Sequence, residues 1–549
     1  MMAKSNQNQD TLVANSAGDG NEMGLLTISD MIRAHARLYP EKIGVRDSRR
    51  ALTFAQWDER ASRLANAMHA LGLRKGDRVG LYAYNRFEWM ELYVGLARAG
   101  LVAVPINFRL VGPEIAYILK HCDARSIIAQ EELLENIEVL RTDPELESLS
   151  YIQLGGEVKP GWTAYEDVIA SGSPAPPDVS VGPEDMAAIM YTSGTTGNPK
   201  GAIRRHHANS LIAILTALEM GFSRDDIGYL VMPMCHANSL YFSLSFSYIG
   251  AECVIDDRRS FDPEATLREF AERKITFTSL VPTHFIMMLG LPEAVKAKYN
   301  VDSIEKFMIS SAPARSDTKL AILEYFRNSK LYELYGSTEA GWVTLLRPEE
   351  QLDRLGSVGR EWSGTGAIRF FDPDGNEVPD GEVGELYSHT PFVFEGYWND
   401  PVKTQEAFRG AYCSVGDMGR RGEDGFIHLV DRKSNLIISG GENIYPSEVE
   451  IVIGSHPAVK DVAVIGVPDE KWGESVRSVI VAHAGKSVSE GEIVEWCMSR
   501  MAAYKRPRSV VFVNDDDIPR TSTGKILHRV LRERFGKAAG ATDTDISGS

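Results

Sequence analysis

Strand-like and helix-like segments alternate along much of this 549-residue chain, and this alternation limits the folds that it can adopt. The runs 79–84, 101–106 and 126–129 are apolar and rich in β-formers, while 60–71 and 88–99 carry apolar residues at helical spacing. The same order recurs at 251–255, 263–272 and 277–281. Because parallel strands are joined through crossovers that are usually helical, the pattern predicts an α/β fold with largely parallel sheets covered by helices.

Composition shifts divide the chain into a large and a small part. A polar start, a Pro/Gly/Ser-rich connection at 171–185 and charged stretches at 420–424 and 431–435 mark the changes. The last part has an α+β pattern of its own, with helices predicted near 447–453 and 526–535 around strands at 462–467 and 476–483. We therefore predict a disordered tail at 1–24, a large multi-subdomain N-terminal domain at 25–433, a small C-terminal domain at 434–535 and a second tail at 536–549.

The charge balance excludes several classes of partner. Lys plus Arg number 59 and Asp plus Glu number 76, which gives a net charge of -17. This acidic excess argues against a nucleic-acid partner and against a polybasic membrane anchor. The 43% of hydrophobic residues supplies enough apolar side chains for large cores.

Cysteine spacing and hydropathy indicate a cytoplasmic protein. Five cysteines lie far apart without a Cys-x-x-Cys pair, which argues against a disulfide framework or a zinc knuckle. No apolar run reaches the roughly 18 residues that a membrane span needs, and the N-terminus lacks the apolar segment of a signal peptide. We expect no integral membrane segment, and a homodimer stays open.

The most informative motif is 191–201, which reads YTSGTTGNPKG. Its three glycines and four Ser or Thr residues allow backbone N–H and hydroxyl groups to surround a polyphosphate, and Lys200 adds a positive charge. It is not a Walker A loop, because Gly201 follows Lys200. A flexible surface loop is the alternative.

Two further motifs suit a nucleotide. In YGSTEAG at 335–341, Tyr335 could stack on a base, Thr338 could reach a phosphate and Glu339 could hold Mg²⁺, which prefers oxygen ligands. In YCSVGD at 412–417, Asp417 could accept two ribose hydroxyl groups. Taken singly, a strand end with a solvated glutamate and a simple turn would explain them equally well.

The last two motifs lie near the C-terminus. In 431–448, Gly440 and Gly441 permit close backbone approach before a helix, although a tight strand-to-helix connection would also need them. In 519–527, Lys525 stands in a Gly/Thr loop that is predicted to open the last helix, where the helix dipole and the ammonium both favour an anion. A solvated surface lysine is the alternative.

Taken together and in this order, the five motifs resemble those of the adenylate-forming superfamily, which holds acyl-CoA synthetases, stand-alone adenylation domains and firefly luciferase. The resemblance runs from about residue 26 to residue 533. It implies a mobile C-terminal domain and an ATP-dependent carboxylic acid–CoA ligase of the fatty-acyl or aryl type, with ATP, Mg²⁺ and coenzyme A as cofactors. A carboxylate would attack the α-phosphate to give an acyl-adenylate and pyrophosphate, and the CoA thiol would then displace AMP.

The resemblance also implies a role for each motif residue. Lys525 bridges the carboxylate and the α-phosphate, Thr338 contacts that phosphate, and Glu339 is the Mg²⁺ ligand. The phosphate loop comprises Thr192, Ser193, Gly194, Thr195, Thr196, Gly197 and Lys200. The remaining nucleotide and CoA contacts are Tyr335 on adenine, Asp417 and Arg432 on ribose, the Gly440–Gly441 loop on pantetheine, and Trp472 and Arg506 on the CoA nucleotide.

In the family, Lys525 and the Gly440 loop serve different half-reactions, because the small domain rotates about a hinge. Here the hinge would fall near 432–435, where Ser434 replaces the charged residue that is usual at that position.

The acyl pocket is the least determined part of the resemblance. The segment MPMCHAN at 232–238 presents His236 as the pocket histidine, with a hydrogen-bonded core histidine as the alternative. The other pocket residues that we expect are Ser311, Ala312, Pro313, Gly336 and Gly341, although the family usually has more glycine at 310–313. Bulky Trp342 favours short-chain, medium-chain or aromatic acids over very long chains.

Two other functions compete with a CoA ligase. A stand-alone adenylation enzyme would load a carrier thiol, and its amino-acid-specific forms typically use a pocket aspartate, which 235–238 lacks; Asp262 looks like a helix cap instead. A non-catalytic nucleotide-binding regulator of the same fold would be expected to lose Glu339, Lys525 or the glycines of the first loop, all of which are present.

Overall fold

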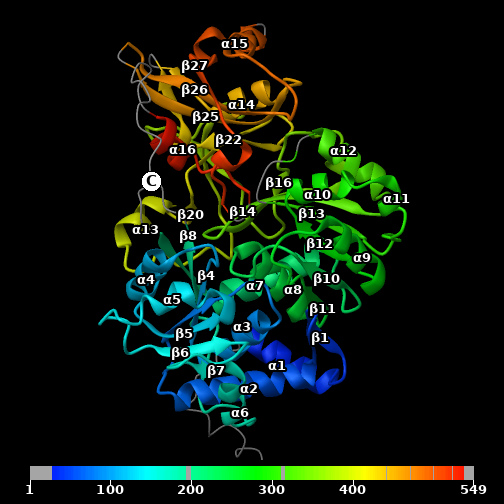
Figure 1. Cartoon of the computed structure of the whole chain (residues 1–549), viewed down its shortest axis with the longest axis vertical. Helices are drawn as coiled ribbons and strands as arrows, with labels where there is room; N and C mark the ends of the chain where they lie inside the picture. The colour runs from blue at the N-terminus through cyan, green and yellow to red at the C-terminus, as the bar shows by residue number, and fades with distance from the viewer. Residues whose placement is uncertain are drawn as a thin grey trace, which may run out of the picture.

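The computed structural model describes residues 27–192, 199–310, 314, 316–439, 442–469, 471–498, 500–521 and 524–536. Two large sheets with helices form the N-terminal part, and a small α+β unit stands above them in Figure 1. The mixed α/β architecture expected from the alternating pattern is confirmed. The tails predicted at 1–24 and 536–549 lie outside the described residues, apart from Gly536.

One large sheet has seven strands in the order β7-β6-β5-β3-β4-β8-β9. Its strands are β3 (Arg78–Tyr82), β4 (Val102–Ile106), β5 (Ala124–Gln130), β6 (Ser150–Leu154), β7 (Thr163–Ala164), β8 (Met186–Thr192) and β9 (Lys200–Arg205). Neighbouring strands run parallel except for β8 and β9, which are antiparallel. The strand runs predicted at 79–84, 101–106 and 126–129 are therefore β3, β4 and β5.

The other large sheet has nine strands in the order β16-β15-β14-β13-β12-β10-β11-β1-β2. Its strands are β1 (Ile43–Arg46), β2 (Ala51–Thr53), β10 (Ile227–Leu230), β11 (Glu252–Ile255), β12 (Phe277–Leu280), β13 (Lys306–Ile309), β14 (Lys330–Ser337), β15 (Gly341–Leu346) and β16 (Arg360–Glu361). Its centre, from β1 to β14, is parallel, and its edges are antiparallel.

Helices cover these sheets, and a continuous apolar core joins them. The N-terminal helices are α1 (Ile28–Leu38), α2 (Phe54–Ala70), α3 (Glu88–Ala99), α4 (Gly112–His121), α5 (Glu135–Glu138), α6 (Tyr165–Ser171), α7 (His206–Met220), α8 (Ala237–Ile249), α9 (Pro263–Arg273), α10 (Pro282–Leu289), α11 (Glu293–Lys296), α12 (Ser316–Tyr325) and α13 (Pro401–Ala407). Helix α8 is buried at every residue from Asn238 to Tyr248, as a helix packed on all sides must be. The core that surrounds it takes side chains from both large sheets, such as Ala103 and Phe277.

Local signals explain where several helices begin. The hydroxyl of Thr53 caps α2 by accepting from the N–H of Gln56, so this helix starts six residues before the predicted 60–71. Asp262 caps α9 by accepting from Ala265 N–H at 2.9 Å, which confirms its interpretation as a cap. Among the described residues, no helix has both the length and the apolarity needed to cross a bilayer.

A four-stranded antiparallel sheet links the large sheets to the C-terminal unit. It consists of β17 (Arg369–Phe371), β18 (Gly384–Tyr387), β21 (Asp417–Arg421) and β22 (Ile427–Arg432), with the hairpin β19 (Phe408–Arg409) and β20 (Tyr412–Cys413) beside it. Strand β22 leads through a short 3₁₀ turn, Lys433–Asn435, into the small unit. Strand β22 thus ends at Arg432, and the domain boundary at 433/434 stays a prediction.

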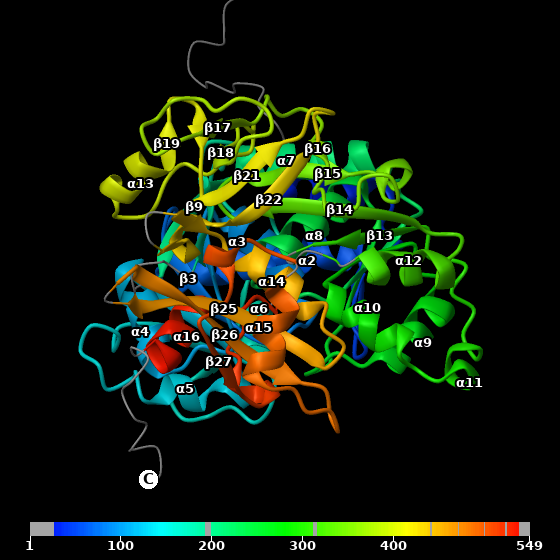
Figure 2. The same ribbon diagram turned by 90° about the horizontal axis from the view of Figure 1, so that it is seen from above.

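The small unit contains one sheet and three α-helices among its described residues. The strands are β23 (Ile437–Ser439), β24 (Glu442–Ile444), β25 (Val459–Asp469), β26 (Gly473–Ala482) and β27 (Ser509–Phe512), and the helices are α14 (Pro446–Gly454), α15 (Glu490–Met498) and α16 (His528–Phe535). Figure 2 shows this unit, orange to red, on the side of α4 and α5 and away from α9 and α11.

Candidate active site

Three strand ends bring the nucleotide-type residues together. Tyr335 lies near the end of β14, and its hydroxyl donates to Asp417 Oδ2 at 2.6 Å. Asp417 opens β21 and faces Arg432 across the β21–β22 pair, where Arg432 Nε lies 2.8 Å from Asp417 Oδ1. The charge of Asp417 raises the pKa of Arg432, so this guanidinium stays protonated. The predicted adenine and ribose residues thus form one hydrogen-bonded cluster.

Glu339 is held rigidly in the turn between β14 and β15. Its carboxylate oxygen Oε1 accepts from Tyr397 Oη at 2.9 Å and from Thr192 Oγ1 at 3.2 Å, and the side chain is buried. Its backbone carbonyl accepts from Phe394 N–H at 2.7 Å. The preceding carbonyl, that of Thr338, accepts from Tyr241 Oη at 3.2 Å. A carboxylate fixed in this way can present its second oxygen to a cation.

Lys200 opens β9, and its side chain lies close enough to Glu339 for their charges to interact. Its Nζ lies 4.1 Å from the centre of the Tyr397 ring, a cation–π distance. Burial lowers the pKa of Lys200, and the charge of Glu339 opposes that shift. The rest of the predicted phosphate loop, Ser193, Gly194, Thr195, Thr196 and Gly197, lies outside the described residues.

Lys525 reaches the same cluster from the small unit. Its side chain is exposed to solvent, and the charges of Arg432, Asp417 and Glu339 act on it. Burial lowers the pKa of Lys525 and the Arg432 charge lowers it further, while Asp417 and Glu339 oppose these effects. An ammonium close to a carboxylate pair and a guanidinium is suited to an anionic substrate.

The predicted position of Lys525 at the start of the last helix is wrong. Helix α16 begins at His528, three residues later, and has no side-chain cap. Lys525 instead follows a tight turn in which Gly524 has φ +83° and Lys525 N–H donates to Thr521 Oγ1 at 3.1 Å. This turn, closed by a bridge between Arg520 and Ile526, positions Lys525 without help from the helix dipole.

His236 lies at the N-terminus of α8, facing the same region. Burial lowers the pKa of His236 to about 4, and the charges of Arg109 and Lys525 act in the same direction. The imidazole is therefore neutral near pH 7. Next to it, Asn238 Nδ2 donates to Ser310 Oγ at 2.8 Å and to Ser279 Oγ at 3.1 Å. The predicted pocket residues Ser311, Ala312 and Pro313 follow Ser310 but lie outside the described residues.

The two predicted pocket glycines stand where backbone and rings approach closely. A Cβ on Gly336 would lie 2.4 Å from the carbonyl oxygen of Gly341. A Cβ on Gly341 would lie 2.5 Å from the Phe392 ring, and Gly341 has a φ of +70°. Trp342 beside them is 4% exposed and donates from Nε1 to Thr216 Oγ1 at 2.8 Å. The backbone and side chains around Gly336, Gly341 and Trp342 are therefore tightly packed.

Arg506 and Trp472, which are predicted to bind CoA, contact other residues of the small unit. Arg506 Nη2 donates to the carbonyl of Met498 at 2.9 Å, and the guanidinium carbon of Arg508 lies 4.8 Å from the Trp472 ring centre. Gly440 and Gly441 lie outside the described residues. The candidate site thus comprises Thr192, Lys200, Tyr335, Thr338, Glu339, Asp417, Arg432 and Lys525, and the charge of Lys525 also acts on His236.

The donor set fits Mg²⁺ that arrives with a nucleotide. Within the described part of the chain, no group of three or more His, Cys, Asp or Glu side chains could hold a metal. Mg²⁺ is commonly held by one or two carboxylates plus substrate phosphates, and Glu339 offers one fixed carboxylate.

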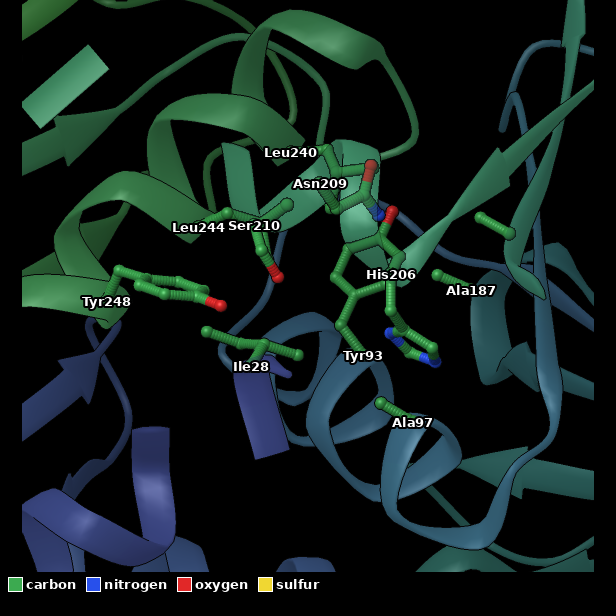
Figure 3. Close-up of a pocket in the computed structure, with 11 residues that line it drawn as sticks. Ile28, Tyr93, Ala97, Ala187, His206, Asn209, Ser210, Leu240, Leu244 and Tyr248 are labelled. Atoms are coloured by element: carbon green, nitrogen blue, oxygen red, sulfur yellow. The ribbon is translucent and has the colours of Figure 1, made fainter. Parts of the chain in front are cut away.

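A small pocket of about 20 Å³ lies between α1, α3, α7, α8 and β8, and none of the predicted site residues lines it. Figure 3 shows His206, Asn209 and Tyr93 around it. His206 Nε2 and Asn209 Oδ1 are buried there without a recorded hydrogen-bond partner, and burial lowers the pKa of His206 to about 4. The volume is enough for about one water molecule. The cavity is too small for an acyl group.

Sequence reasoning missed three residues that hold the Glu339 turn: Tyr397, Tyr241 and Arg204. Tyr397 reaches Glu339 only because its segment pairs with β9 through a bridge between Ala202 and Tyr397. Such a long-range pairing has no local sequence signal. For Arg204, the two-residue alternation along β9 was a usable signal, because it places Arg204 on the same face as buried Ala202.

Comparisons with known proteins show the family of the chain. The sequence matches the family described as AMP-binding enzyme over residues 32–398 and the AMP-binding enzyme C-terminal domain over residues 448–525. It is 35% identical to a feruloyl-CoA synthase from Amycolatopsis sp over 91% of this chain and 97% of that protein. It is 33% identical to an indoleacetate–CoA ligase from Aromatoleum aromaticum, over 92% and 98% of the two chains.

Solved structures show the same similarity. An anthranilate CoA ligase in complex with anthranoyl-AMP superposes with a TM-score of 0.84 and 28% identity, covering 93% of this chain and 97% of that one. An o-succinylbenzoate CoA synthetase from Bacillus subtilis, in complex with its acyl-adenylate intermediate, gives a TM-score of 0.79 at 28% identity, covering 91% and 97%.

Proposed function

Because this chain belongs to the AMP-binding enzyme family of adenylate-forming ligases, we propose that it activates a short-chain, medium-chain or aromatic acid in the Lys525–Glu339 cleft. The protein is an AMP-forming acyl-CoA synthetase. It joins a carboxylic acid to coenzyme A through an acyl-adenylate, and it uses ATP and Mg²⁺. The observation that carries the assignment of the site is the hydrogen-bonded cluster of Tyr335, Asp417 and Arg432 beside the fixed carboxylate of Glu339.

In this proposal the residues of the cleft divide the binding of the nucleotide between them. Tyr335 stacks on adenine. Asp417, which is oriented by Arg432, accepts hydrogen bonds from the ribose hydroxyl groups. Lys200, Thr192 and the remainder of the phosphate loop bind the β- and γ-phosphates. Glu339 is the ligand for Mg²⁺, which neutralises the charge on the phosphate oxygens when bound.

The adenylation step depends on Lys525 and Thr338. The carboxylate oxygen of the acid forms a bond to the α-phosphorus, and the bond from that phosphorus to pyrophosphate breaks. Lys525 places its ammonium between the two anions, and Thr338 donates to the α-phosphate. Positioned cations of this kind stabilise the charge that develops in the transition state more than they stabilise the ground state.

The side chains around Gly336 and Gly341 support the proposed preference for short-chain, medium-chain or aromatic acids. Trp342 packs edge-on against Tyr241, with ring centres 5.1 Å apart, and lies beside Gly336. This bulk favours a short or flat acyl group, for which neutral His236, Gly336 and Gly341 are the described pocket residues that we propose. The relatives named above act on feruloyl, indoleacetyl and anthraniloyl groups, which are aromatic.

The domain boundaries, the hinge and the location in the cell belong to the same proposal. Residues 25–433 bind nucleotide and acid, and residues 434–535 rotate about 432–435 to bring the Gly440–Gly441 loop, Trp472 and Arg506 to coenzyme A. All five cysteines are free and buried, which suits the reducing cytoplasm.

A substrate panel tests this function. Purified protein with ATP, Mg²⁺ and CoA would receive aliphatic acids of two to sixteen carbons, and benzoic, cinnamic and indoleacetic acids, with pyrophosphate and thioester both measured. We expect the highest kcat/KM for an aromatic acid or an aliphatic acid of medium length or shorter. A maximum at the longest acids would contradict the proposed pocket. Thioester on a phosphopantetheinylated carrier but none on CoA would contradict the ligase assignment.

A further inference from the structure

Arg204 is a buried cation without a carboxylate partner among the described residues. It lies on β9 and is 0% exposed. Its Nη1 donates to the carbonyl of Phe392 at 2.7 Å and, at 3.4 Å, to the carbonyl of Thr338. Its Nε and Nη2 are buried with no recorded hydrogen-bond partner. Buried charges are normally paired with opposite charges, so this arrangement is unfavourable for folding.

The guanidinium lies directly behind the Glu339 turn. Its carbon atom is 5.1 Å from the centre of the Tyr241 ring, and Tyr241 Oη donates to the same Thr338 carbonyl that Arg204 contacts. Both side chains therefore donate to the same peptide group, the one that joins Thr338 to Glu339. Phe392, the other partner of Arg204, belongs to the segment whose Phe394 N–H binds the Glu339 carbonyl.

The charge of Arg204 is also felt by the groups around Glu339. The charge of Arg204 lowers the pKa of Tyr241 and of Cys413, whereas the charge of Glu339 raises the pKa of both side chains. Arg204 and Glu339 thus act with opposite sign on the same two buried side chains. A fixed positive charge behind the turn offsets the negative charge that Glu339 carries into the cleft.

The neighbouring arginine shows how unusual this position is. Arg205 is next in the strand but points outward, and its Nη2 forms an ion pair with Glu395 at 2.7 Å. Its side chain is 35% exposed. The two residues share a strand, a size and a charge, so they form a matched pair that differs in burial and in contact with the turn.

We propose that Arg204 is a positioning residue for adenylation: it fixes the Thr338 peptide and supplies buried positive charge behind Glu339, so that the carboxylate is held for Mg²⁺-ATP. This inference rests on the proposed role of Glu339.

The test compares Arg204→Met, Arg204→Lys, Arg205→Met and Glu339→Gln with the unchanged enzyme. Two readouts are measured: the melting temperature with and without Mg²⁺-ATP, in the absence of acid and CoA, and pyrophosphate release with acid across a range of Mg²⁺ concentrations. Methionine keeps much of the volume of arginine and removes the charge, whereas lysine keeps the charge and loses the planar fork of donors.

For Arg204→Met we expect little change in the unliganded melting temperature, because the loss of a costly buried cation and the loss of its hydrogen bonds to the Phe392 and Thr338 carbonyls oppose each other. We expect its stabilisation by Mg²⁺-ATP to shrink and pyrophosphate release to fall about 10- to 100-fold, as for the loss of a charged hydrogen bond. Arg204→Lys should recover part of the activity, and Arg205→Met should match the unchanged enzyme.

Other outcomes would overturn the inference. A lower unliganded melting temperature for Arg204→Met, with normal nucleotide stabilisation and normal Mg²⁺ dependence, would make Arg204 a purely structural residue. If Glu339→Gln shifts the Mg²⁺ dependence and Arg204→Met does not, the Arg204 inference alone fails. If neither variant shifts it, the proposed role of Glu339 fails and takes this inference with it.

Discussion

Replacing Lys319 by methionine should destabilise the protein in a way that grows with pH. Lys319 lies on α12 and forms an ion pair with Glu333 on β14, and the two side chains are 1% and 6% exposed. Burial raises the pKa of Glu333, while Lys319 and the backbone N–H of Ala314 oppose that shift. Without the lysine, the carboxyl loses its ion-pair partner, and its pKa rises further.

The magnitude follows from proton linkage. A group whose pKa is raised in the folded state favours folding at low pH, and this advantage is lost as the pH rises through the folded pKa. Above the ordinary glutamate pKa of about 4.3, Lys319→Met should lose about 1.4 kcal/mol of unfolding free energy per pH unit until Glu333 ionises. At neutral pH the loss should reach about 3–5 kcal/mol, the usual cost of breaking a buried ion pair.

Urea denaturation between pH 5 and pH 8.5 measures this effect through the transition midpoint. Lys330→Met is the matched control, because Lys330 is exposed on the same strand that carries Glu333. The double variant Lys319→Met/Glu333→Leu should remove the pH dependence and recover most of the stability. The reasoning is refuted if Lys319→Met is as stable as the unchanged protein at pH 8, or if its deficit does not vary with pH.

Three further predictions concern the cleft. Lys525→Ala should reduce pyrophosphate release at least about 100-fold while sparing the conversion of supplied acyl-adenylate to acyl-CoA; equal loss of both half-reactions would contradict its role. Glu339→Gln should raise the Mg²⁺ concentration at half-maximal rate, and an unchanged titration would remove Glu339 from the metal site. Trp342→Ala should cost about 3–5 kcal/mol of stability. It should also favour longer acids by about fourfold in kcat/KM for each added methylene that fills the space, as hydrophobic burial predicts; an unchanged chain-length profile would place the acyl pocket elsewhere.

Much of the fold could be predicted from the sequence because local period and long-range pairing agree. The helix expected at 88–99 is α3 residue for residue, and the strand runs at 101–106 and 277–281 are β4 and β12 to within one residue. Strands buried on both faces have continuous apolar runs, which are easy to recognise. Helix starts were harder: α2 begins six residues early because Thr53 caps it.

The candidate site was predictable only where residues of one motif act together. Tyr335, Thr338 and Glu339 lie within five residues, and the fold keeps them adjacent. Arg204, Tyr241 and Tyr397 come from distant segments, and their contacts with the Glu339 turn depend on how α8 and β9 pack. Lys525 was placed at a helix start because the Gly/Thr loop resembled an N-terminal signal, whereas the turn at Gly524 delays the helix.

The nucleotide product tests the central claim most directly. Purified protein with ATP, Mg²⁺, CoA and the best acid of the panel can be followed by chromatography of the nucleotides together with assays for pyrophosphate and orthophosphate. Activation through an acyl-adenylate predicts AMP and pyrophosphate in equal amounts, matched by the acyl-CoA formed. ADP and orthophosphate in their place, with no AMP, would contradict it.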